Sequence, residues 1–132
     1  MEYADSFDHG KPFYGLKVLD LSSVLAGPLA ASFFAELGAD VIKIENKRTG
    51  GDATRQWRLS TEDPESNISA YYFSANFGKE IKFLDLSHPD ERIYLEELIS
   101  KSDIVLSNYQ KKVANKLDLL PDEIIKKYPA II

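Results

Sequence analysis

The chain has 132 residues, of which 44% are hydrophobic and 28% charged, and its formal net charge at pH 7 is -5. This composition is typical of one globular domain and argues against a nonspecific nucleic-acid binder, because phosphate backbones need a basic surface. The absence of cysteine excludes disulfides, thiolate metal sites and cysteine nucleophiles, and it fits a reducing compartment.

The first residues, 1–12, show no apolar period, and we expect a flexible N-terminal arm ahead of a domain at 13–132. They carry acids where a secretory signal needs a basic start and an apolar run. The longest apolar stretch, Val24 to Ala35, falls short of the roughly 20 residues that span a bilayer. We therefore expect a cytoplasmic protein that has no membrane or nucleic-acid partner.

Residues 15–45 read as one complete β-α-β unit. A short apolar strand at Lys17 to Leu21 is followed by a helix that begins at Gly27-Pro28 and stops at Gly38. Because its only polar residues, Ser32 and Glu36, share one face, we expect this helix to be buried on nearly all other sides. Val41 to Ile44 follows as a parallel strand that is covered on both faces.

The remaining chain repeats the alternation of strand and helix after a long polar loop at 46–69, called the excursion below. A third strand is predicted at Ile81 to Leu86, and Ser87 is predicted to cap a helix that begins near Pro89. A fourth strand follows at Asp103 to Leu106. Alternating strands and helices predict an α/β fold with a doubly wound parallel sheet.

Two short helices are then predicted, at 112–117 and 121–128, before Ala130 to Ile132 begins another strand. A chain that stops inside an apolar strand is expected to be the N-terminal part of a larger protein.

Ligands of open parallel sheets bind beyond the carboxyl ends of the strands, so the loops there are the candidate site. Those loops are rich in cations and polar groups, which together with helix N-termini favour a phosphorylated ligand. The alternative is that these side chains are simply solvated. The residues are Lys47, Arg48, Arg55, Arg58, Asn108, Lys111, Lys112 and Lys116.

Glu45 ends the second strand, where a dinucleotide fold places the acid that holds a ribose. The first turn, however, has one glycine where the dinucleotide fingerprint needs three. This argues against NAD and leaves a surface cap as the other role for Glu45.

Four blocks in order, VLDLSSVLAGPLAASFFAELGADVIKIE, GGDATRQW, NFGKEIKFLDLSHPDE and SDIVLSNYQ, resemble the N-terminal part of the class III CoA-transferases, the formyl-CoA and carnitine-CoA transferase family. The resemblance implies a Rossmann-like parallel sheet with helices on both faces, of which this chain is an incomplete fragment of the large domain. It also implies a homodimer of interlocked protomers for the full-length protein.

In that family, CoA passes from an acyl-CoA thioester to a carboxylic acid after an aspartate attacks the acyl carbonyl. The resemblance places this aspartate beyond Ile132, so we assign no catalytic residue and expect the chain alone to be inactive. None of Asp20, Asp52, Asp85 and Asp103 is expected to replace this nucleophile. Asp20 and Asp85 are interpreted as residues that make structural hydrogen bonds.

The same resemblance implies that this chain carries part of the site for coenzyme A, bound as the acyl-CoA substrate. Val24, Leu25 and Ala26 would line the pocket near the thioester and pantetheine. Arg48 would stand in for a family arginine whose place is taken by Asn46. Positions matching CoA, adenine and phosphate contacts are Leu84, Asn108, Tyr109, Lys116 and Leu117. Core packing is the alternative role for Tyr109 and Leu117.

No metal is expected, because His9 and His88 lie far apart and neither has a second ligand at helical spacing. The leading hypothesis is the N-terminal portion of a CoA-transferase that acts on acyl-CoA and carboxylic acid substrates. The alternatives are a standalone nucleotide-binding domain and a noncatalytic interaction module of the same fold.

Overall fold

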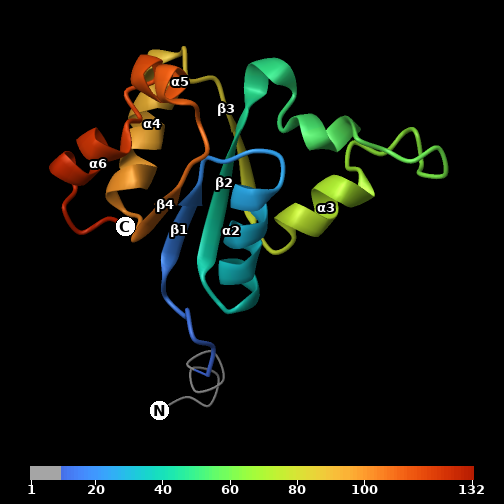
Figure 1. The fold of residues 1–132 in the computed structure, drawn as a ribbon, viewed down its shortest axis with the longest axis horizontal. Coiled ribbons are helices and arrows are strands. Elements are labelled where there is room, and N and C mark those ends of the chain that lie inside the picture. The colour runs from blue at the N-terminus through green and yellow to red at the C-terminus, as the bar shows by residue number, and fades with distance from the viewer. Residues whose placement is uncertain (1–9) are drawn as a thin grey trace.

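The computed structural model describes residues 10–132, and these contain a four-stranded sheet in the order β3-β2-β1-β4 (Figure 1). Every neighbouring pair is parallel, which confirms the predicted α/β class. Most of the predicted arm, residues 1–9, lies outside the described residues. The strands are β1 (Lys17–Asp20), β2 (Asp40–Asn46), β3 (Glu80–Leu84) and β4 (Ile104–Leu106).

Helices cover both faces of the sheet (Figure 1). One face carries α2 (Ala26–Glu36), with α3 (Ala70–Asn76) beside it. The other face carries α4 (Pro89–Ser100), α5 (Lys111–Lys116) and α6 (Pro121–Lys127). Two short 3-10 helices, η1 (Lys47–Thr49) and η2 (Ala53–Gln56), lie in the excursion after β2.

The alternation of strand side chains divides the core into two layers. Val18 and Val41 pack with Ala31 of α2 on one face, whereas Leu19 belongs to the cluster on the α4 face. That second cluster is the larger one, and its buried members are Leu19, Leu21, Ile44, Leu84, Leu95, Ile99, Leu119 and Ile131.

Two local expectations were wrong, and one helix was not predicted. Helix α2 begins at Ala26, which makes Pro28 its third residue rather than its first. Ser87 does not cap α4: the N-cap position belongs to His88, and the Ser87 hydroxyl donates to Asp85 instead. Helix α3 was not predicted, and its start is fixed by Ser69, whose hydroxyl accepts a hydrogen bond from the Tyr72 amide.

The predicted strand at the end of the chain is present only as backbone pairing. No strand is assigned there, but the Ile132 amide donates to the Asp103 carbonyl, and the Ile132 carbonyl accepts from the Val105 amide, both at 3.0 Å. These two bonds extend the ladder beside β4.

Helix α2 is less buried than its sequence predicted. Its buried residues are Pro28, Ala31 and Ser32, whereas Leu29 and Phe33 are 52% and 57% exposed. The neighbouring α3 contacts α2, and there the Ser32 hydroxyl donates to the Ala75 carbonyl. Within residues 10–132, no helix combines the length and the apolar character needed to cross a membrane.

Candidate functional site

The loops that follow the four strands gather at one edge of the sheet, at the top of Figure 1. Two pockets open there. The larger pocket has a volume of about 480 Å³ and the smaller pocket about 210 Å³. They adjoin, since both are lined by the end of β2, residues 44–46, and by Tyr109.

The larger pocket combines an apolar lining with two cations and an aromatic ring. Arg48 and Lys116 are exposed at its rim, and Tyr109 contributes the ring. Burial, together with the negative charge of Asp20, raises the pKa of the Tyr109 hydroxyl, so this side chain is neutral at physiological pH. The apolar residues of the lining are Ile44, Leu84, Leu86, Val113 and Leu117.

The smaller pocket is more polar. It lies between the turn after β1, residues 22–24, and the start of the excursion after β2. Its lining includes Lys43 and Asp52, both of which are buried.

The structure brings most of the sequence-predicted site residues to this edge. Five of them, Arg48, Leu84, Tyr109, Lys116 and Leu117, line the larger pocket, and Val24 lines the smaller one. Tyr109 and Leu117 also pack against the larger core cluster, so the structure supports their alternative role as well. Contact with CoA stays a prediction for all of them.

The other three predicted residues lie elsewhere. Leu25 is the N-cap residue of α2 and Ala26 begins that helix, and neither lines the two pockets. Asn108 lines neither pocket, and its side chain binds the Ser23 backbone twice: Oδ1 accepts from the amide at 3.0 Å and Nδ2 donates to the carbonyl at 2.8 Å.

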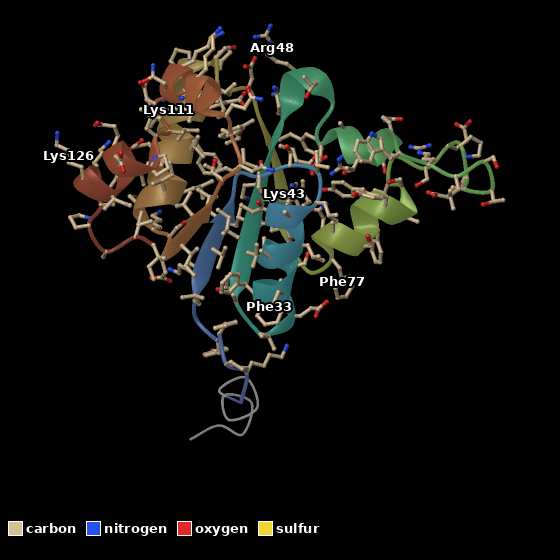
Figure 2. All side chains as sticks on the ribbon, in the orientation of Figure 1. Phe33, Lys43, Arg48, Phe77, Lys111 and Lys126 are labelled. Atoms are coloured by element: carbon tan, nitrogen blue, oxygen red, sulfur yellow. The ribbon has the colours of Figure 1, made fainter. Side chains whose placement is uncertain are left out.

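The predicted basic rim is smaller than expected. Arg55 is buried rather than rim-forming, and Arg58 donates to the Pro64 carbonyl at 2.8 Å, away from the pockets. Lys47 lies 3.4 Å from a Glu91 carboxylate oxygen. Figure 2 shows Arg48 and Lys111 toward the top of the molecule and Lys126 on the separate helix α6. Of the predicted lysines of α5, Lys111 and Lys112 line neither pocket.

Glu45 is not a ribose-binding acid or a surface cap, because its carboxylate is buried and fully engaged. Arg55 donates to both oxygens, at 2.7 and 2.9 Å, and the Tyr72 hydroxyl and the Asp52 amide also donate to it. Burial alone would raise the pKa of Glu45, but the hydrogen bonds from Arg55, Tyr72 and Asp52 outweigh it and hold the pKa below its usual range. Burial and the Glu45 carboxylate in turn raise the pKa of Tyr72.

A second buried network lies beside the first. The Lys43 ammonium group donates to the Ser22 carbonyl at 2.7 Å and lies 3.3 Å from Asp52 and 3.8 Å from Asp20. Asp20 also accepts from Lys79 at 2.8 Å, which confirms its structural role. Burial lowers the pKa of Lys79, an effect that the charge of Asp20 partly opposes.

Sequence reasoning missed Lys43 and the pocket position of Asp52. One signal was available: a lysine in a strand that is predicted to be covered on both faces needs a buried acid. The register supplies one, because Lys43 is the direct neighbour of Asp20 on β1. Within residues 10–132, no group of three or more His, Cys, Asp or Glu side chains is arranged to hold a metal ion.

Comparison with known proteins shows the family to which the chain belongs. CoA-transferase family III matches residues 13–132. The succinate–glutarate CoA-transferase of Agrobacterium fabrum is 39% identical over 103 residues, which are 76% of this chain and 26% of that protein. A probable fatty acyl-CoA transferase of Mycobacterium tuberculosis is 34% identical over 122 residues, which are 92% of this chain and 30% of the relative.

The fold is shared with solved structures as well. The crystal structure of Rv3272 from Mycobacterium tuberculosis superposes with a TM-score of 0.79 at 33% identity, over 93% of this chain and 32% of that one. The chain thus spans about a third or less of the length of the relatives that it matches.

Two neighbouring glycines test whether the Glu45 network fixes the loop after β2. Both have positive φ, but a Cβ on Gly50 meets no atom within 4 Å, whereas one on Gly51 falls 2.1 Å from Glu45 Oε2. Gly50→Ala should cost about 1 kcal/mol of unfolding free energy through backbone strain alone. Gly51→Ala should cost at least about 2 kcal/mol more, because Arg55 prevents the carboxylate from moving. Urea denaturation measures both, and equal losses would contradict a locked Glu45.

Acidification tests the buried ion pair. Because the folded pKa of Glu45 is held below its usual range, the stabilisation from its ion pair is fully present above the unfolded pKa of a glutamate and is lost as the pH falls through the folded pKa. Glu45→Gln should lower the unfolding free energy by about 3 kcal/mol at neutral pH, since Arg55 is left buried and unpaired. The difference from wild type should shrink under acid.

The matched control for this test is Glu80→Gln, which removes the exposed pair with Lys82. It should cost at most about 1 kcal/mol. Denaturation curves at a series of pH values measure both variants. A Glu45→Gln loss as small as the control, or one that stays constant on acidification, would refute the assignment.

Proposed function

We propose that this chain, which belongs to CoA-transferase family III, is part of an enzyme that moves CoA between an acyl-CoA thioester and a carboxylic acid, and that it contributes part of the CoA site. The observation that carries the proposal is the pair of adjoining pockets at the carboxyl edge of the sheet, six of whose lining residues were predicted from sequence. The names of the relatives, a succinate–glutarate CoA-transferase and a probable fatty acyl-CoA transferase, support the substrate class.

The larger pocket suits the nucleotide end of CoA. Its apolar lining and the Tyr109 ring offer a surface for the adenine base, and Arg48 and Lys116 offer charges for the phosphates. The pantetheine arm would then run along the end of β2 toward Val24 in the smaller pocket, which places the thioester beside the turn after β1.

The buried carboxylates at this edge are poorly suited to serve as the nucleophile. Asp20 and Glu45 are held by lysine or arginine, and Asp52 by Lys43 and Thr54. A carboxylate in such pairs is a poor nucleophile, because attack on a carbonyl would leave its cation buried and unpaired. We therefore propose that the attacking aspartate lies outside residues 10–132 and that this chain alone is inactive.

The assembly and location are also proposed from the resemblance. We propose a cytoplasmic enzyme whose full-length form is a homodimer. The apolar side chains exposed on α2 and α3, which include Leu29, Phe33, Phe73 and Phe77, support an additional protein contact, since contiguous apolar patches mark interfaces. Sedimentation of the full-length protein measures the dimer.

The second candidate is a CoA-binding module that has no catalytic activity. For the isolated chain this candidate is favoured by the pairing of Asp20, Glu45 and Asp52 with buried cations. The two candidates share the CoA site and differ in turnover. Transfer of CoA from succinyl-CoA to glutarate by the full-length protein, followed by chromatography, would separate them.

Calorimetric titration of the chain with CoA tests the shared site. We expect CoA to bind, and Lys116→Ala to weaken binding about tenfold, because a charge-assisted hydrogen bond to phosphate contributes about 1.5 kcal/mol. Arg48→Ala should act in the same direction. The matched control is Lys126→Ala, which removes an exposed lysine from α6 and should leave the affinity unchanged.

Titrations with NAD and ATP complete this experiment. NAD binding without any response to CoA would contradict the proposed site, as would equal losses of CoA affinity in the Lys116 and Lys126 variants.

A further inference from the structure

We propose that Asp52 and Lys43 are positioning residues that hold the β1 turn, defined as residues 22–24, in the shape that the smaller pocket presents to CoA. This inference rests on the proposed function and adds a second group of residues to it. Asp52 and Lys43 would act through the backbone of the β1 turn rather than through the ligand.

The β1 turn contains a backbone conformation that needs support. Val24 has a φ of 72°, in the left-handed region that a β-branched residue rarely adopts. Such a conformation persists only where the surroundings determine it. The support comes from Asp52, whose Oδ2 accepts the Val24 amide at 3.1 Å.

The rest of the β1 turn is held from neighbouring strands. Asp20 Oδ1 accepts the Ser22 amide at 2.9 Å, and Lys43 Nζ donates to the Ser22 carbonyl at 2.7 Å. Asn108, after β4, binds both polar groups of the Ser23 backbone. Each residue of the β1 turn is therefore bound by a side chain that lies outside it.

Asp52 is itself fixed in one orientation. Its Oδ1 accepts the amide and the hydroxyl of Thr54, at 3.0 and 2.8 Å, which leaves Oδ2 to face Val24 and Lys43. Burial would raise the pKa of Asp52, but the bonds from Thr54, the charge of Lys43 and the Val24 amide outweigh it and lower that pKa. Asp52 is thus charged at neutral pH and strengthens its bond to the Val24 amide.

Lys43 couples the two ends of the β1 turn. Its ammonium group bonds the Ser22 carbonyl and lies against the same Asp52 oxygen that holds Val24. Leu25, the next residue, is the N-cap of α2, so the β1 turn also sets where that helix begins. Loss of the Asp52 bond would release Val24 from the left-handed region and change one wall of the smaller pocket.

Three variants and two measurements test this inference. Asp52→Ala removes the acceptor, Asp52→Asn keeps a carbonyl oxygen that can face Val24, and Ser32→Ala is the control. The control deletes a buried hydrogen bond between α2 and α3 without touching the β1 turn. Calorimetry measures CoA affinity, and amide hydrogen exchange followed by NMR measures protection at Val24.

We expect Asp52→Ala to weaken CoA binding about tenfold and to remove the exchange protection of the Val24 amide, since one buried hydrogen bond is lost. Asp52→Asn should restore part of both. Ser32→Ala should lower stability while leaving CoA affinity and Val24 protection at the wild-type level. If Asp52→Ala does not fold, Thr54→Val carries the test, because it removes the hydroxyl that orients Asp52 and should reduce both quantities in part.

Two results would overturn the inference while leaving the proposed function intact. One is an unchanged CoA affinity in a variant whose Val24 amide has lost protection. The other is a weakened affinity with full Val24 protection, which would mean that Asp52 contacts the ligand directly. Failure of the wild-type chain to bind CoA would instead refute the proposed function, and the positioning role with it.

Discussion

The ammonium group of Lys43 is the constraint on which the carboxyl edge of the sheet depends. Its side chain is 1% exposed and sits on a strand that is covered on both faces, so it needs partners within the protein. Asp20, Asp52 and the Ser22 carbonyl provide them. Because these groups come from β1, from the loop after β2 and from the β1 turn, one buried charge fixes three segments of backbone together.

The Glu45 network fixes the excursion after β2 in the same way, through one buried charge that binds several segments. Arg55, Tyr72 and the Asp52 amide converge on one carboxylate, and this joins η2 and α3 to the end of β2. Gly51 passes so close to that carboxylate that a side chain would collide with it. Among the described residues, no buried side-chain nitrogen or oxygen is left without a partner, as a polar network at this depth requires.

Burial also divides the cations of the site into two kinds. Arg55, Lys43 and Lys79 are enclosed and neutralised by acids, so they support the scaffold. Arg48 and Lys116 remain exposed around the larger pocket, where a ligand can reach them. An acidic protein can therefore present a local basic rim, because Asp20, Glu45 and Asp52 near this edge are occupied by the buried cations.

The sequence by itself determined the β-α-β rhythm, the parallel sheet, the edge where the pockets open and the family. These follow from the local periodicity of apolar residues, from glycine and proline at the ends of helices, and from the order of the motifs. Each of these signals can be read within short segments of the chain. Only the tertiary structure decided which charged residues face a ligand. Arg48 and Arg55 look alike in the same loop, yet one is exposed at a pocket and the other is buried against Glu45. Likewise, only the tertiary structure shows that the Asn108 side chain binds the backbone of Ser23, which lies 85 residues earlier in the sequence. Pairing of this kind depends on strand register and on the desolvation of charge, neither of which is encoded locally.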